Sequence, residues 1–468
     1  MVFSSLIFIY AFLPLSLLAY FLCPTLKSKN ISLLVSSLIF YAWGEPLYVF
    51  LLVGMAYIAW YCAKKISRKR SEDKKRKYLL IAVISDIVLI SFFKYASLFC
   101  SIFGEVPDFV KNIALPIGIS FYTFQLLSYV VDVYRGDASA QSKFYNVLLY
   151  ASLYHQCIAG PIVRYKSISR ELFVKRGAKG NLLKGINRFA IGLAKKALLA
   201  NPCGALCDSI FSAGALSELS ALGSWTGIIA FALQIYLDFS AYSDMAIGMG
   251  MMLGLHYGEN FDYPYMSRSV KEFWRRWHIS LGTFFRDYVY IPLGGSRVSK
   301  SRYILNLFIV WSLTGLWHGA SWNFVLWGIY FFVFLLLEKF VIGEFLEKHR
   351  VISHVYLLLV VLFGWILFHF TSVSDGFTVF KSLFCLNGNP LSNFISRTVF
   401  VNNITLFLVS GFFCTPCAKM LFSKLSEKLS GSSAWEFISS SVFPVILLVL
   451  STASLVGDSY NPFIYFQF

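Results

Sequence analysis

Apolar runs long enough to cross a bilayer recur from one end of this 468-residue chain to the other. The chain is 57% hydrophobic and 14% charged, whereas soluble proteins average about 25% charged residues. We therefore predict an all-α polytopic membrane protein with roughly 11–14 transmembrane or re-entrant helices. The expected organisation is one membrane domain over residues 1–468, with no separate soluble domain.

The apolar runs also place the expected crossings. The first, residues 2–22, has no basic region before it and is too long for a typical signal peptide, so it is expected to be retained. The run 224–255 is long enough for two short helices or one kinked helix. The other expected crossings are 31–43, 47–63, 79–98, 114–134, 145–163, 185–200, 303–317, 320–340, 353–371, 400–419 and 438–456.

Basic residues indicate how the chain is oriented. The net charge is +17, and nine basic residues lie between Lys64 and Lys77, where two apolar runs are joined. We favour a cytoplasmic loop over a nucleic-acid-binding patch, because short basic loops stay on the cytoplasmic side. This places the N-terminus outside, makes 339–350 and 419–430 cytoplasmic linkers, and leaves the aromatic tail 461–468 outside at the membrane interface.

The segment 259–297 departs from the apolar rule. It carries ten charges in 39 residues, yet it is rich in Trp, Phe and Tyr. Short interfacial or re-entrant helices fit both facts. One helix is expected to start at the capping pattern Ser269 to Glu272, and another to end at Pro292-Leu-Gly-Gly. The arginines of this segment could bind the phosphates of a donor, or form a lipid-headgroup belt; they are Arg275, Arg276 and Arg286.

His318 is the most unexpected polar residue, because it lies in the apolar stretch 311–322. Intramembrane ionisable side chains are rare and tend to mark functional sites. Gly315 and Gly319 have the spacing that lets helices approach closely. On a continuous helix, Thr314 and Ser321 would share one face with His318, and either hydroxyl could orient its ring.

A second histidine, His278, lies in the polar segment. Two histidines that lie close together could divide the chemistry, one as general base and the other as an orienting or charge-stabilising group. The alternative is that each is a packing residue with satisfied hydrogen bonds, which is the commoner fate of a lone membrane histidine.

Two intramembrane carboxylates, Asp238 and Asp244, allow two interpretations. They could form the ion site of a transporter, or a buried polar brace that reaches the arginines of 268–286. The nine cysteines predict neither a disulfide framework nor a zinc site, because Cys414-Thr-Pro-Cys417 has no second pair at metal spacing. We expect no bound metal or cofactor.

Several sequence blocks resemble the membrane-bound O-acyltransferase family, in particular its bacterial branch of alginate O-acetyltransferase and teichoic-acid D-alanyl transferase. They occur in order over most of the chain. The blocks are Tyr41-Ala-Trp-Gly-Glu-Pro46, Leu115-Pro-Ile-Gly-Ile-Ser-Phe-Tyr-Thr-Phe-Gln125, Ala159-Gly-Pro-Ile-Val-Arg164, Asp238-Phe-Ser-Ala-Tyr-Ser-Asp244, Phe273-Trp-Arg-Arg-Trp-His-Ile-Ser-Leu281, Phe285-Arg-Asp-Tyr-Val-Tyr-Ile-Pro-Leu-Gly-Gly295 and Gly315-Leu-Trp-His-Gly-Ala320.

The resemblance implies that His318 is the family's catalytic histidine and that His278 occupies its second active-site position, which is often Asn in eukaryotic relatives. It implies a fold of many helices ringed around a central funnel or tunnel. Residues expected to bind substrate or donor are Arg275, Arg276, Arg286, Asp287, Trp317, Thr314 and Ser321.

The activity implied is acyl transfer from a cytosolic thioester, acetyl-CoA, to a hydroxyl on the outer side of a bacterial cytoplasmic membrane. The acceptor would be an envelope polysaccharide or peptidoglycan, reached through a separate esterase-like transferase. The tail Pro462–Phe468 and the block at 41–46 resemble the O-acetylating branch. Two alternatives stay open: D-alanyl transfer from a carrier protein to teichoic acid, and a non-enzymatic transporter.

Overall fold

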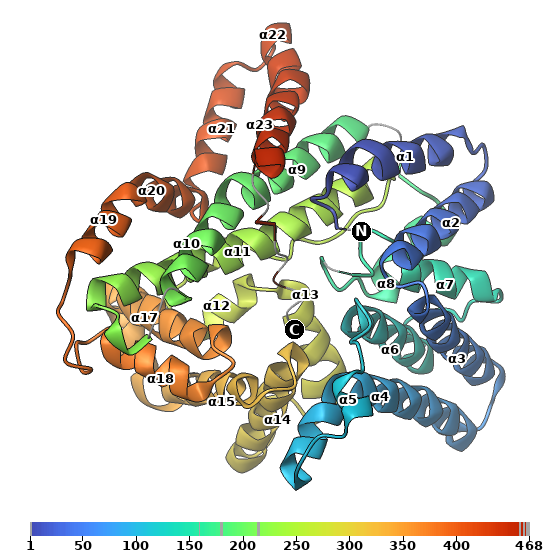
Figure 1. Ribbon diagram of the computed structural model, residues 1–468. Helices are drawn as coiled ribbons and strands as arrows, with labels where there is room; N and C mark the ends of the chain where they lie inside the picture. Colours follow the sequence, from blue (N-terminus) through green and yellow to red (C-terminus); the bar gives the residue numbers. More distant parts are fainter. Residues whose placement is uncertain are drawn as a thin grey trace. The chain divides into compact units, whose positions relative to one another are not determined.

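The computed structural model describes residues 2–158, 160–177, 181–212, 216–457, 460, 461 and 464. Within these ranges the chain is helical and contains no β-strand. The chain forms two compact units (Figure 1). Unit 1 comprises Met1–Phe189 and Tyr242–Glu259, and unit 2 comprises Ala190–Ala241 and Asn260–Phe468.

Unit 1 holds the helices coloured blue to teal in Figure 1. In it, α3 packs against α4, α6 and α7, and α2 packs against α7. The elements of unit 1 are η1 (Phe8–Phe12), α1 (Leu13–Leu22), α2 (Leu26–Gly44), α3 (Tyr48–Arg68), α4 (Glu72–Phe103), α5 (Asp108–Lys111), α6 (Ile119–Arg135), α7 (Phe144–Ser152) and α8 (Tyr165–Phe173). Two of the three unit boundaries fall within further helices, α9 (Leu182–Ala194) and α11 (Ala221–Met252), and the third lies between Glu259 and Asn260.

Unit 2 carries the short helices of the polar segment and the helices that follow them. Here α15 packs against α12, α14 and α17. Its elements are η3 (Lys195–Ala200), α10 (Asn201–Phe211), η4 (Leu216–Glu218), η5 (Pro264–Met266), α12 (Val270–Arg276), α13 (Ile279–Phe285), η6 (Arg286–Tyr290), α14 (Lys300–His318), α15 (Trp322–Leu337), η7 (Glu338–Ile342), α16 (Gly343–Lys348), α17 (Arg350–His369), α18 (Val373–Ser382), α19 (Phe394–Asn402), α20 (Ile404–Phe413), α21 (Cys417–Lys428), α22 (Ser433–Phe437), η8 (Ile438–Val442) and α23 (Phe443–Gly457).

The prediction of an all-α polytopic membrane protein is confirmed. Among the described residues, six helices are long and apolar enough to cross a membrane, or seven if the pair α19 and α20, bent by 49°, forms one span. The run 224–255 lies almost wholly in the single 32-residue helix α11. In the apolar stretch of this helix that could cross a membrane, 83% of the residues are buried. Several of the other expected crossings correspond to shorter helices.

Three expectations about helix ends were wrong. The crossing expected at 145–163 ends as a helix at Ser152, because the next residue, Leu153, has a ψ of 114° and so leaves the helical conformation. The linker expected at 339–350 is mostly helical, since α15 continues through η7 and α16 to Lys348. The linker expected at 419–430 lies largely within α21.

The basic region between Lys64 and Lys77 is also more helical than a loop. Helix α3 extends to Arg68 and α4 begins at Glu72, so only residues 69–71 connect them. The ends suit the helix dipoles, because Lys65 and Arg68 lie in the last turn of α3 and acidic residues open α4.

The two intramembrane carboxylates form a brace, but with other partners than expected. Asp238 pairs with Lys196 at 2.8 Å, and both side chains are buried. Asp244 pairs with Arg188 at 2.6 Å, and the same guanidinium reaches Glu259 at 2.6 Å. The expected reach to the arginines of 268–286 is therefore corrected: the cations come from α9 and η3.

The cysteine thiols are free, and Cys414 is buried while Cys417 is partly exposed. Of the C-terminal tail, residues 462, 463 and 465–468 lie outside the described residues. Within the tail, Ile464 is buried and its backbone N–H donates to Asp238 Oδ2 at 3.2 Å.

Candidate active site

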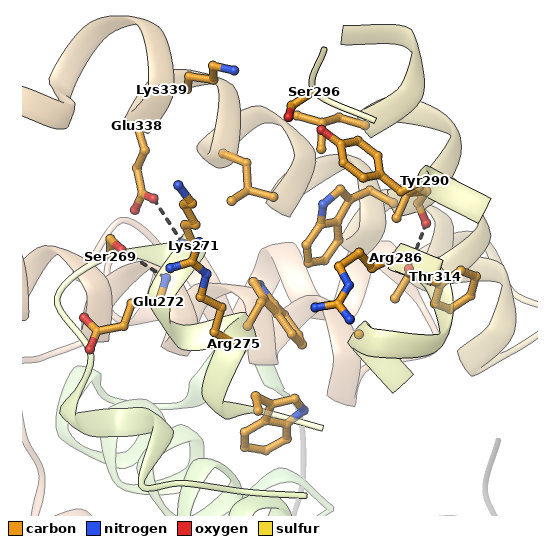
Figure 2. Close-up of a pocket in the computed structure, with 18 of the residues that line it drawn as sticks. Ser269, Lys271, Glu272, Arg275, Arg286, Tyr290, Ser296, Thr314, Glu338 and Lys339 are labelled. Carbon is orange, nitrogen blue, oxygen red and sulfur yellow. Dashed lines mark hydrogen bonds between the residues drawn. The ribbon is translucent and has the colours of Figure 1, made fainter. Parts of the chain in front are cut away.

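Unit 2 contains a cavity of about 1140 Å³, lined by the polar segment and by α14, η7 and α16 (Figure 2). His278 and His318 both line it, although they lie forty positions apart in the sequence. Its wall is rich in charge. The charged lining residues are Arg268, Lys271, Glu272, Arg275, Arg286, Glu338, Lys339, Glu344 and Glu347.

Helix α12 begins where two side chains satisfy its first N–H groups. The Ser269 hydroxyl accepts from the Glu272 N–H at 3.0 Å, as the capping pattern predicted. Glu338 accepts from the N–H groups of Val270 and Lys271 at 2.5 and 3.1 Å. Figure 2 shows Glu338 directed from η7 toward this helix start. The start of α12 is thus tied to η7.

His278 lies directly between α12 and α13, as the residue before Ile279. Its φ is +46°, a left-handed backbone conformation that costs a residue with a Cβ about 1–3 kcal/mol. The side chain is 2% exposed, and burial lowers the pKa of His278 to about 3. The imidazole is therefore neutral near pH 7, able to donate from one ring nitrogen and accept at the other.

His318 is the last residue of α14 and is 6% exposed. Its ring packs edge-on against Trp327 and Phe368, each with ring centroids 5.0 Å apart. Trp317 contacts both histidines: its ring centroid lies 4.9 Å from that of His318 and 5.8 Å from that of His278. The indole of Trp317 therefore packs against both imidazoles.

Of the two glycines expected to allow close helix packing around His318, Gly315 lies at a helix crossing, whereas Gly319 lies beyond the end of α14 and faces the Phe324 ring. A Cβ on Gly315 would lie 2.3 Å from the carbonyl oxygen of Phe324, and one on Gly328 would lie 2.4 Å from that of Trp311. Only glycine fits at either position, so α14 and α15 cross backbone to backbone. This crossing lies one turn before His318 and sets where the end of α14 lies.

The structure brings some predicted binding residues to the cavity and leaves others away from it. Arg275, Arg286 and Thr314 line it, whereas the described lining does not include Arg276, Asp287, Trp317 or Ser321. Trp317 nevertheless contacts both histidines, as described above. The Thr314 hydroxyl donates to the Val310 carbonyl oxygen at 2.8 Å.

The side chains of Arg276 and Asp287 are held by neighbours. Arg276 pairs with Glu272 at 2.9 Å, one helical turn earlier. Asp287 accepts a hydrogen bond from Arg286 at 2.7 Å, which raises the pKa of Arg286. Arg286 therefore reaches the cavity with a carboxylate beside it.

The expectation that Ser321 shares a helix face with His318 was wrong. Helix α14 ends at His318, Gly319 is extended, and Ser321 is the residue before α15. The helical i+3 relation therefore does not apply to it.

Sequence reasoning missed the cavity residues on η7 and α16. Glu338, Lys339 and Glu344 lie in or beside the segment interpreted as a cytoplasmic linker. Their signal was a charged stretch that follows an apolar run without any helix-breaking residue before Gly343. Within the described residues, no group of three or more His, Cys, Asp or Glu side chains could hold a metal ion.

Known proteins are similar to this chain in sequence, two of those described below over its full length. Residues 3–379 match the model of the membrane-bound O-acyltransferase family. The "Probable alginate O-acetylase" of Azotobacter vinelandii is 32% identical over the full length of both chains. The peptidoglycan O-acetyltransferase of Helicobacter pylori is 29% identical over 100% of this chain and 98% of its own. The teichoic acid D-alanyltransferase of Bacillus subtilis is 26% identical over 49% of this chain and 60% of its own.

Proposed function

The chain belongs to the membrane-bound O-acyltransferase family, as its sequence blocks predicted, and from this premise we propose that it transfers an acetyl group from a cytosolic thioester to an envelope hydroxyl. The acceptor is a polysaccharide or peptidoglycan hydroxyl, or a hydroxyl of a partner transferase that passes the acetyl group on. One observation carries the proposal: His278 and His318 line the same cavity and pack on the same indole.

The proposed chemistry needs one base. His318 removes the proton from the acceptor hydroxyl as the oxygen attacks the acyl carbon. The new carbon–oxygen bond forms, the carbon–sulfur bond of the thioester breaks, and the proton passes from His318 to the leaving thiolate. A thioester is already activated, so this step calls on the protein mainly for proton transfer and orientation. Neutral His278 orients a reactant or donates a hydrogen bond to the oxygen that gains negative charge.

The proposed donor is acetyl-CoA, which carries several phosphate groups. The cavity wall offers cations for them on two elements of the polar segment, with Lys271 and Arg275 on α12 and Arg286 on η6 (Figure 2). Glu338 lies beside Lys271, and its carboxylate oxygens accept backbone N–H groups of α12. Acidic Glu344 and Glu347 in the same wall favour a donor that presents its phosphates toward α12 and η6.

The proposed setting is a bacterial cytoplasmic membrane, with both termini outside and the donor on the cytoplasmic side. The acyl group then crosses to the outer side. There it is received by an extracytoplasmic esterase-like transferase or directly by the polymer. The similarity to alginate and peptidoglycan O-acetyltransferases over the whole chain favours acetyl over D-alanyl transfer, because the D-alanyltransferase match covers about half of it.

The test is mass spectrometry of envelope glycans from cells that carry His318→Ala. We expect O-acetyl esters to fall to the level of a strain without the protein, while D-alanine esters are unchanged. Loss of D-alanine esters with unchanged O-acetyl content would favour D-alanyl transfer instead. If both esters persist, His318 is not the base, and if glycan export alone is affected, the transporter alternative gains support.

A further inference from the structure

Residues 260–262 lie beside residues 276–279 in unit 2. Two backbone hydrogen bonds join these stretches, one on each flank of His278. The N–H of Asp262 donates to the carbonyl oxygen of Arg276 at 2.9 Å, and the N–H of Ile279 donates to the carbonyl oxygen of Asn260 at 2.9 Å. The first bond lies two residues before His278 and the second one residue after it. The backbone of His278 is therefore held from both sides by the segment 260–262.

The side chain of Asn260 adds two more bonds on the α13 side. Its Oδ1 accepts from the Ser280 N–H at 3.0 Å and from the Ser280 hydroxyl at 2.9 Å. Asn260 is 1% exposed, so water does not compete for these bonds. It is not among the described residues that line the cavity, so it affects the site only through the backbone and side chains that it bonds.

These bonds replace a helix cap that His278 does not provide. His278 precedes the first residue of α13, where a side chain usually accepts from the N–H of the second or third helical residue. Its side chain makes no such cap, and Asn260 accepts the first two N–H groups of α13 in its place. The imidazole is thus released from capping and lines the cavity.

The backbone of His278 also needs such support. A non-glycine residue at a φ of +46° persists only where its surroundings determine the conformation. The capping bonds of Asn260 and the bond from Asp262 to Arg276 are those surroundings.

We propose that Asn260 is a positioning residue, which holds the left-handed turn at His278 and so presents the imidazole to the cavity beside Trp317. This inference rests on the proposed function, in which His278 orients a reactant. Asn260 itself touches no reacting atom. Its contribution to turnover passes entirely through His278.

The first experiment is a double-mutant cycle on acetyl transfer by the full-length protein in membranes. Asn260→Leu removes the acceptor, and we expect kcat to fall about ten- to a hundredfold with KM for the donor little changed, as for a misplaced catalytic group. Asn260→Asp keeps Oδ1 and should retain most of the activity. The double variant Asn260→Leu/His278→Ala should be no slower than His278→Ala alone.

Two results of this cycle would overturn the proposal. Asn260→Leu could turn over at the wild-type rate, or its effect could multiply with that of His278→Ala, as expected of a general structural role. Should the leucine variant fail to accumulate, Ser280→Ala removes one of the two bonds to Oδ1. Its smaller loss of kcat must likewise vanish when His278 is already alanine.

A second readout does not depend on activity. Diethyl pyrocarbonate modifies neutral imidazoles that the reagent can reach. Peptide mass spectrometry measures the rate at which His278 is modified. That rate should rise in Asn260→Leu and stay at the wild-type level in Asn306→Leu. The control replaces another buried asparagine of unit 2, one that bonds the carbonyl oxygens of Leu293 and Gly295.

The two readouts separate failure of the inference from failure of the proposed function. If His278→Ala is fully active while His278 becomes more reactive in Asn260→Leu, the proposed catalytic role of His278 is wrong. The inference that Asn260 holds the turn at His278 is then still supported. If the reactivity of His278 is unchanged in Asn260→Leu, Asn260 does not hold this turn and the inference is wrong.

Discussion

At the scale of single residues, two adjacent arginines of α12 meet different surroundings. Successive residues of an α-helix point about 100° apart. Arg275 consequently faces the cavity, while Arg276 turns back to Glu272 and Asp262, at 2.9 and 3.6 Å. Both were expected from the sequence to bind the donor, and the structure brings only Arg275 to the cavity wall.

Substitutions of Arg275 and Arg276 can therefore be compared as a matched pair, one at the cavity wall and one away from it. Arg275→Gln should raise KM for the thioester donor about tenfold, the loss expected for one charge-assisted contact to phosphate. Arg276→Gln should leave KM within about twofold, because partly exposed ion pairs contribute little. Steady-state kinetics with varied acetyl-CoA measures both. Equal effects on KM would contradict the assignment of Arg275 to the donor.

At the scale of elements, the crossing of α14 and α15 positions His318. The two glycines face each other, with the Cα of Gly328 3.4 Å from a Cβ placed on Gly315. Membrane helices pack through such small residues, because backbones that approach closely gain van der Waals contact. Any added carbon at this crossing must push the end of α14, and His318 with it, away from α15.

Gly328→Ala should therefore lower stability by about 1–3 kcal/mol, as overpacking does, and lower kcat as well. Gly54→Ala in α3 is the control, because a Cβ there meets nothing within 4 Å. Alanine favours a helix over glycine, so this variant should be at least as stable as wild type. Thermal unfolding in detergent measures both. An alanine at 328 that leaves the melting temperature unchanged would show that the crossing can relax.

At the scale of the whole molecule, the positive charge predicts how the chain lies in the membrane. Helix α3 has the basic connection 69–71 at one end and the residues around Leu47 at the other. Because basic connections stay cytoplasmic, Leu47 is expected outside. Both Leu47 and Ser71 are exposed.

Cysteines at these two positions test the orientation against each other. In spheroplasts, a membrane-impermeant maleimide should label Leu47→Cys and should label Ser71→Cys only after the membrane is opened. The wild-type protein, with its own cysteines, gives the background. The reverse labelling pattern would place the N-terminus in the cytoplasm and the proposed donor on the other face.

Much of the helical content was readable from apolar length, but helix ends were not. The segments 64–77 and 339–350 look like loops because they are charged, yet α3, α4 and α16 carry most of them. Charge is compatible with a helix once the residues lie beyond the hydrocarbon layer or face a cavity, as Glu338 and Lys339 do. Apolar length marks where a membrane helix crosses and says little about where it stops.

The membrane setting and the family follow from composition and from short blocks of neighbouring residues, and the same blocks mark the two histidines as candidates. Only the tertiary structure placed His278 and His318 in one cavity, separated Arg275 from Arg276, and revealed Asn260 behind His278. The physical reason is that a side chain's direction depends on where its helix ends and what caps it. In this chain Asn260 and Glu338, which supply such contacts, lie 20 and 68 positions from the residues that they bond.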